Sequence, residues 1–493
     1  MHGYIAKEKN DLNMDKQSDT LKNFIWRFAE RTSSQIVTLV VSIAIARVVA
    51  PEAYGTLALI TVITSLLQLF VDCGLSTALI QKKNVDDLDY SSVFYFNMFL
   101  CVALYILTFI LSPMIAYVYN DKSLVNIIRV AGILILVSGV KGVQQAYVAR
   151  NALFKIFFFS TLGGTIISAI VGLIMAYSGY GVWALVMQIL SNATFDTMIL
   201  WFTVRWRPKK LFSWTRLKSL VSFGWKLLIS SLLGSGYTSI SNLVIGKVFS
   251  TTDLAYYTQG DKYPNIIVGN ICMSVDSVIL PVMSKEQDNK KKVRQITRKT
   301  LKMNTYILVP LMMGLAFCAE PIVGLLFTEK WLYCVPYLRM YCIIYMLWPM
   351  HNVNIDAINA LGRSDMVLKF ELIRNLVSVC MLLITSRVGL IYVAYGVLIT
   401  SIFTQVLISS YNGKLIDYGF IDQLKDIGPS ILLGTIMGVI VYFFKFLGFS
   451  SVVTVLLQVL VGGGVYIGTS CVLKLDEIYW LKRVIKIYLK DKI

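Results

Sequence analysis

Long apolar segments dominate this chain and restrict what it can fold into. A helix needs about 20 apolar residues to cross the hydrocarbon core of a bilayer, which is roughly 30 Å thick. Fourteen such runs follow one another, at residues 22–50, 55–80, 91–117, 124–149, 153–176, 180–203, 221–248, 264–283, 303–327, 337–359, 366–386, 389–410, 427–446 and 450–472. These runs are continuous, whereas the strands of a membrane β-barrel alternate apolar and polar residues. The sequence therefore predicts an all-α polytopic membrane protein with 14 transmembrane helices.

The distribution of Lys and Arg indicates the orientation of these helices. With the N-terminus inside, 35 of the 46 Lys and Arg residues lie in or beside inner segments, seven in outer segments and four within spans. Cytoplasmic loops carry such an excess of positive charge. We therefore expect a multi-pass protein of the cytoplasmic (inner) membrane with both termini in the cytoplasm. The same bias explains most of the net charge of +18, so no nucleic-acid partner is expected.

The order of the runs predicts the organisation of the chain. We expect two six-helix lobes in a parallel pseudo-repeat, followed by two C-terminal helices. The segments are a cytoplasmic tail at 1–20, an N-lobe at 21–203, a basic cytoplasmic linker at 204–220, a C-lobe at 221–410, two further spans at 427–472 and an amphipathic cytoplasmic-surface helix at 473–493. In the last segment, apolar and basic residues occupy different helical faces, as in helices that lie on a membrane surface.

The short loops and the scarcity of catalytic residue types argue against an enzyme. The connections between runs are too short for a folded domain, and the sequence lacks the G-x-x-x-x-G-K-[ST] loop that would cradle ATP. His351 stands among apolar and amide residues, and the eight cysteines form no C-x-x-C pair. We interpret His351 as a packed residue and the cysteines as small apolar residues. No metal site and no cofactor is predicted.

Two stretches of the chain align with each other, which suggests the repeat. Trp26-Arg27 matches Trp225-Lys226, and each first helix is followed by an acid and an aromatic residue, in Pro51–Gly55 and in Thr252–Tyr257. The next span carries one acid in its inner half in both copies, Asp72 and Asp276. Parallel repeats of this kind place a substrate path between the halves.

Polar residues recur on one face of each first helix. They lie at matching helical offsets, Arg27, Arg31, Gln35, Thr38 and Ser42 in the first copy and Lys226, Ser230, Gly234, Tyr237 and Ser241 in the second. A polar stripe is unfavourable against lipid, so we expect both to line a hydrated cavity. Arg27, Arg31, Lys226, Gln35 and Tyr237 are the candidate substrate-binding residues, because cations suit an anionic group and Arg binds phosphate through two hydrogen bonds.

Other interpretations of these charges stay open. Arg27 and Arg31 could anchor their helix at the interface while pairing with Glu30, three residues after Arg27. Glu30, Asp72 and Asp276 are candidates for coupling or gating, although either aspartate could simply cap or hydrogen-bond a neighbouring helix. Glu371 and Arg374, three residues apart, are predicted to form a structural pair.

The segment Ile45-Ala-Arg-Val-Val-Ala-Pro-Glu-Ala-Tyr-Gly55, followed by Gly74-Leu-Ser-Thr-Ala-Leu-Ile-Gln81, resembles a known family. It is similar to the polysaccharide flippases, the O-antigen, colanic acid and teichuronic acid translocases of the multidrug/oligosaccharidyl-lipid/polysaccharide exporter superfamily. The likeness is clearest over the first hundred or so residues. Arg47, Pro51 and Gly55 carry the R-x-x-x-P-x-x-Y/F-G motif, for which we expect a hinge or turn role.

The resemblance implies a function as well as a fold. It implies a non-enzymatic secondary transporter that moves undecaprenyl-diphosphate-linked oligosaccharide to the outer leaflet for surface polysaccharide or lipopolysaccharide biosynthesis, by alternating access through a cationic central cavity. Its partners would be the lipid-linked oligosaccharide diphosphate and membrane lipid, with other polysaccharide-assembly proteins as further candidates. The alternatives are a cation-coupled multidrug antiporter of the same superfamily and a membrane glycosyl polymerase.

Overall fold

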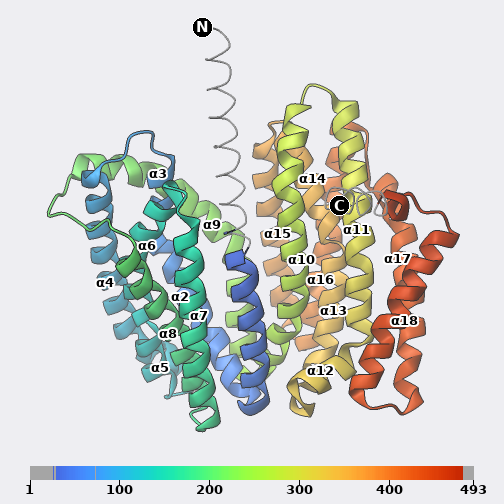
Figure 1. Ribbon diagram of the computed structural model, residues 1–493, viewed down its shortest axis with the longest axis horizontal. Helices are drawn as coiled ribbons and strands as arrows, with labels where there is room; N and C mark the ends of the chain where they lie inside the picture. Colours follow the sequence, from blue (N-terminus) through green and yellow to red (C-terminus); the bar gives the residue numbers. More distant parts are fainter. Residues whose placement is uncertain (1–25, 27–28, 73, 481–493) are drawn as a thin grey trace, which may run out of the picture. The chain divides into compact units, whose positions relative to one another are not determined.

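The computed structural model describes residue 26 and residues 29–72 and 74–480. These residues divide into two compact units, the first extending to Lys247 and the second beginning at Val248 (Figure 1). Every regular element in the described ranges is a helix. The all-α class predicted from the sequence is therefore confirmed.

The first unit is built from a helix over residues 29–48 and eight further helices. These are α2 (Pro51–Asp72), α3 (Leu75–Gln81), α4 (Asp87–Val118), α5 (Leu124–Ala131), α6 (Ile133–Arg150), α7 (Phe154–Tyr177), α8 (Val182–Thr203) and α9 (Trp214–Val248). Helices α7 and α8 lie side by side along most of their length (Figure 1). Helix α9 begins inside the segment predicted as a linker, so the second half of that segment is helical.

In its described part, the second unit contains a helix over residues 476–480 besides nine longer α-helices and two short 3-10 helices. They are α10 (Thr251–Lys285), α11 (Lys290–Phe317), α12 (Ala319–Phe327), η1 (Glu329–Cys334), α13 (Val335–Met346), α14 (Trp348–Ala360), α15 (Ser364–Thr385), α16 (Leu390–Ile416), α17 (Phe420–Phe443), η2 (Phe444–Leu447) and α18 (Ser451–Val472). Helix α11 packs against α17, and α17 packs against α18 (Figure 1).

Eleven stretches of helix in the described residues are long and apolar enough to cross a membrane. They correspond to eleven of the fourteen predicted runs. The others are the first run, which lies partly outside the described residues, the run at 337–359, which is divided between α13 and α14, and α15, which carries Lys369, Glu371 and Arg374. A multi-pass membrane protein is confirmed, and the count of 14 spans stays a prediction.

Several runs predicted as continuous helices are broken. The run at 124–149 divides at Gly132, the run at 303–327 at Cys318 and the run at 337–359 at Leu347. Proline explains the last two breaks. Pro321 and Pro349 lie in the first turns of α12 and α14, where the N–H that proline lacks would have had no partner within the helix.

The break between α2 and α3 coincides with a close approach of two backbones. Gly74 has a left-handed φ of 64°, which favours glycine. A Cβ atom at this position would lie 2.8 Å from the carbonyl oxygen of Gly224 in α9. Small residues allow helices to approach this closely, as packing in lipid requires. The two glycines therefore determine where α9 crosses the first unit.

Each unit has its own apolar core. In the first unit, one cluster joins α3, α4, α6 and α8 to the start of α9 through Leu79, Val93, Leu200, Trp206 and Leu217. In the second unit, Ile478 packs with Tyr306, Met437 and Tyr466 of α11, α17 and α18. Ile478 belongs to the predicted surface helix, of which residues 481–493 lie outside the described residues, as do the predicted tail at 1–20 and Arg27.

The contact between α11 and α17 gives a direct test of this packing. A Cβ atom at Gly438 would lie 2.2 Å from the ring of Phe317, whereas a Cβ atom at Gly463 in α18 would meet nothing within 4 Å. We expect Gly438→Ala to destabilise the protein by about 1–3 kcal/mol, the usual effect of overpacking. Thermal unfolding of the purified protein in detergent measures this change. Gly463→Ala is the matched control and should leave the midpoint unchanged; equal midpoints for both variants would contradict the packing described.

Candidate functional site

The polar stripe predicted on the first helix lies on the surface of the first unit. Arg31, Gln35 and Thr38 are exposed, and Ser42 is half-buried. Glu30, by contrast, is only 8% exposed, so its side chain points into the unit rather than along the stripe. The substrate-binding role of Arg31 and Gln35, and of Arg27 outside the described residues, stays a prediction.

The second stripe runs along α9, which also belongs to the first unit. Lys226, Ser230 and Gly234 are exposed, while Tyr237 is half-buried. The far end of α9 is fixed to the end of α4, where the Tyr119 hydroxyl donates to the Leu243 carbonyl at 3.1 Å and the Lys247 ammonium donates to the Val118 carbonyl. Lys226 therefore lies on a helix held at its C-terminal end, with its side chain accessible.

The residues of the R-x-x-x-P-x-x-Y/F-G motif form a helix–turn–helix junction. The first helix ends at residue 48, and Pro51 begins α2, where its fixed φ suits the first helical turn. Arg47 is exposed at this turn and Gly55 is buried in the first turns of α2. The second copy of the repeat has the same spacing, because α9 ends at Val248 and α10 begins at Thr251. This geometry fits the turn role expected for the motif.

An ion pair lies inside the helix bundle of the first unit. The Lys141 ammonium of α6 is 2.5 Å from a carboxylate oxygen of Asp196 on α8, and the Asp196 side chain is 6% exposed. The charge of Lys141 also reaches Asp72, the predicted coupling residue, which is exposed at the end of α2. Lys141 is therefore held within α6 by a buried partner on α8, a contact that the sequence analysis did not predict.

The second unit brings its predicted coupling residue together with a second acid. Asp276 of α10 accepts a hydrogen bond of 2.9 Å from Asn352 of α14, and its carboxyl also faces that of Asp356. The predicted structural pair is confirmed: Arg374 lies 2.5 Å from Glu371, which is also 3.7 Å from His351. His351 is 8% exposed and stacks near Trp348, as expected of a packed residue.

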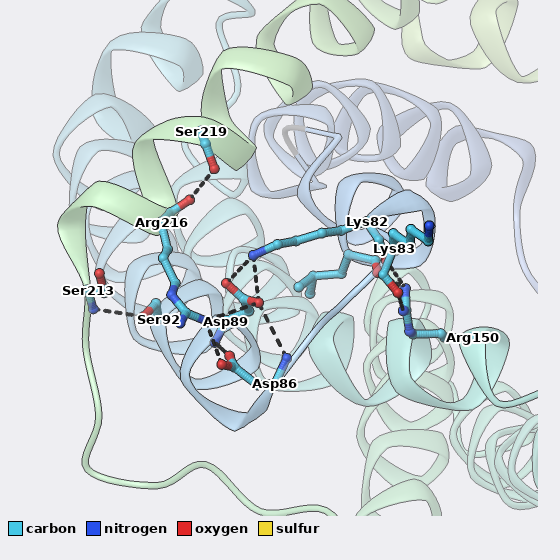
Figure 2. A network of polar contacts seen from close by, with 10 residues as sticks. Lys82, Lys83, Asp86, Asp89, Ser92, Arg150, Ser213, Arg216 and Ser219 are labelled. Atoms are coloured by element: carbon cyan, nitrogen blue, oxygen red, sulfur yellow. Dashed lines mark hydrogen bonds and ion pairs between the residues drawn. The ribbon is translucent and has the colours of Figure 1, made fainter.

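A network of polar contacts fixes the turn between α3 and α4 (Figure 2). Lys82 binds both carboxylate oxygens of Asp89 at 2.6 and 2.7 Å, and Asp86 caps α4 by accepting from the Asp89 N–H at 3.0 Å. Arg216 of α9 lies 2.5 Å from Asp86. The hydrogen bond from the Arg216 guanidinium lowers the pKa of Asp86 below its ordinary value of 3.8, and the hydrogen bond from the Asp89 backbone N–H lowers it further.

Arg150, at the end of α6, holds the same turn from the other side. Its guanidinium donates to the carbonyls of Leu79, Ile80, Lys82 and Lys83 at 2.6–3.0 Å (Figure 2). A planar guanidinium can bind several acceptors at once, which a lysine cannot do with the same geometry. Lys82 and Lys83 are therefore part of a structural joint that links α3, α4, α6 and α9.

The described residues do not meet the requirements of a metal site. Within 29–72 and 74–480, no group of three or more His, Cys, Asp or Glu side chains could hold a metal ion. The arrangement instead offers exposed cations on two helices of the first unit and intramembrane acids in both units. Such groups can bind an anionic ligand or carry charge, and they need no covalent step.

The Lys141–Asp196 pair yields a quantitative test. Removing one member of a buried pair leaves an uncompensated charge and destabilises a protein by roughly 3–5 kcal/mol. We expect Lys141→Met to lower the thermal midpoint strongly, and Lys141→Met combined with Asp196→Asn to recover most of the loss. The single and double variants, purified in detergent, form a double-mutant cycle. A double variant as unstable as Lys141→Met would show that the pair is not the source of the effect.

Comparison with known proteins agrees with this arrangement. Residues 44–336 match the family described as polysaccharide biosynthesis protein. The chain is 26% identical over 475 residues to an uncharacterised membrane protein in the cps region of Klebsiella pneumoniae, covering 92% of this chain and 95% of that protein. It is 24% identical to the lipopolysaccharide biosynthesis protein WzxC of Escherichia coli, over 75% of this chain and 76% of that one.

A solved structure shows the same fold. The lipid II flippase MurJ in its inward closed conformation superposes with a TM-score of 0.77, covering 92% of this chain and all of that one at 19% identity. The family match spans more than half of the chain. This chain belongs to the polysaccharide biosynthesis protein family.

Proposed function

We propose that this chain is a flippase that moves undecaprenyl-diphosphate-linked oligosaccharide repeat units across the cytoplasmic membrane for export of a surface polysaccharide. Family membership carries the proposal, because the family and the named relatives belong to polysaccharide biosynthesis. The fold of a lipid II flippase supports it, since that fold accommodates a flippase. The protein acts as a transporter and not as an enzyme.

The chemistry of the exposed stripes suits the diphosphate of such a substrate. Arg31 and Lys226 are accessible on two helices of the first unit, and Gln35 and Tyr237 accompany them with hydrogen-bonding groups. Hydrogen bonds between a cation and phosphate are roughly twice as strong as neutral ones. We place the diphosphate against these side chains and Arg27, in a cationic central cavity, with the lipid tail in the bilayer.

Translocation then proceeds by alternating access. The two predicted lobes, at residues 21–203 and 221–410, would rock against each other and expose the cavity first to the inner and then to the outer leaflet. In this division Lys226 belongs to the second lobe, although α9 packs within the first compact unit. In this scheme the chain has 14 spans with both termini in the cytoplasm. The turn formed by Arg47, Pro51 and Gly55 joins the first two helices and would transmit the movement of one to the other.

Two other functions receive less support. A multidrug antiporter would need a site for organic cations, whereas the exposed stripes carry Arg31 and Lys226, and the family is one of polysaccharide biosynthesis. A membrane polymerase would need catalytic groups positioned outside the membrane. Other assembly proteins, such as a polymerase, would act as partners after translocation.

Deletion of the gene for this chain tests the proposed function directly. We expect lipid-linked repeat units to accumulate in the inner leaflet and surface polysaccharide to disappear, because synthesis continues while translocation stops. Extraction of the lipid-linked oligosaccharides, followed by mass spectrometry, measures the accumulation. Normal surface polysaccharide in the deletion strain would rule out the proposed role.

Substitutions in the stripes test the cationic site. Loss of one charged hydrogen bond weakens binding by about 1.5–3 kcal/mol, which is tenfold or more in affinity. We therefore expect Arg31→Ala and Lys226→Ala to reduce export by about tenfold, and Lys226→Glu to reduce it further by repelling phosphate. Export is measured as surface polysaccharide at matched protein levels in the membrane. Lys210→Ala, an exposed cation of the same unit outside the stripes, is the control and should export normally.

A further inference from the structure

The contact between α10 and α14 contains two carboxyl groups that face each other. Asp276 and Asp356 lie at hydrogen-bonding range. Asp356 is only 8% exposed, and its Oδ2 atom and the Oδ1 atom of Asp276 are buried with no hydrogen-bond partner in the described part of the chain. Two ionised carboxylates only accept hydrogen bonds, so they cannot satisfy each other in this position.

The surroundings of the two acids supply one donor and no positive charge. The Asn352 side chain donates to Asp276 Oδ2 at 2.9 Å, which leaves the other oxygen of Asp276 for Asp356. Among the described residues, neither acid forms an ion pair with Lys or Arg, and the nearby titratable group is the Cys272 thiol of α10. Arg374 of α15 is already bound by Glu371, which also faces His351 of α14.

We propose that Asp276 and Asp356 form a proton-binding site, in which the two carboxyl groups share one proton and hydrogen-bond to each other. One proton converts an acceptor into a donor and satisfies both buried oxygens. Like charges held this closely do not both ionise, and the proton then belongs to the pair rather than to either residue. Asn352 fixes which oxygen of Asp276 faces its partner.

The shared proton also links the two helices. Asp276 lies on α10 and Asp356 on α14, and these two helices pack against each other. Release of the proton would place two negative charges between α10 and α14 and weaken their contact. Use of this step to drive translocation rests on the flippase function proposed above. The binding of the proton does not.

Infrared spectroscopy of the purified full-length protein, without substrate, tests the site. A protonated carboxyl has a C=O stretching band that a carboxylate lacks. At neutral pH the wild-type protein should show such a band. Asp276→Asn and Asp356→Asn should each remove the contribution of the shared proton to this band, because the remaining acid then faces an amide donor and ionises. Either variant is sufficient, provided that it elutes as a single peak in size-exclusion chromatography.

Asp426→Asn is the matched control. Asp426 belongs to the same unit but accepts two hydrogen bonds from Arg298 at 2.7 and 2.8 Å, so it is ionised and its replacement should leave the band unchanged. A wild-type protein without the band, or a band that persists in both pair variants, would overturn the proposal. A band that disappears on exchange of potassium for sodium at constant pH would overturn it too, since the site would then hold a metal cation. Because no substrate is present, failure here is distinct from failure of the flippase function.

Discussion

Every polar group that enters the hydrocarbon core must find its partner within the protein, because lipid supplies none. The helices meet this requirement for the backbone, and several side chains meet it in pairs. Lys141 with Asp196 in the first unit, and Asn352 with Asp276 in the second, each join two helices through one polar contact. These contacts determine which helical faces turn inward, and the apolar faces follow.

The exposed cations of the first unit contrast with these internal pairs. Arg31 and Lys226 are accessible, whereas Lys141 and Arg150 are bound to a carboxylate and to carbonyl groups. A cation that is already paired contributes to structure, and an accessible cation remains available to a ligand. This distinction, and not the number of positive charges, is the reason why we propose the two stripes as the binding site of the diphosphate.

The sequence predicted the class of the fold well, because the length of an apolar run shows directly whether a helix can cross a bilayer. It did not predict the helix breaks at Gly132 and Leu347, which leave hydropathy unchanged. It missed Lys141 for a related reason: only the position of α8, about fifty residues later, shows that this lysine has a buried partner.

For the site, the sequence identified Asp276 by its place in the repeat, yet it gave Asp356 no role. Nothing along the chain indicates that two acids eighty residues apart face each other, since this depends on how α10 and α14 pack. The polar stripes were visible from helical spacing alone. Their exposure agrees with that pattern, while the ligand that they would contact follows from chemistry and family membership.

The four hydrogen bonds that Arg150 donates to the turn after α3 depend on the main chain of that turn. All four groups that it binds are main-chain carbonyls, which every amino acid possesses. The main chain of this turn is thus held by a residue about seventy positions away, in addition to the side-chain contacts of Lys82, Asp86 and Asp89. Substitution of the Leu79, Ile80 or Lys83 side chain would leave the carbonyl acceptors of Arg150 in place.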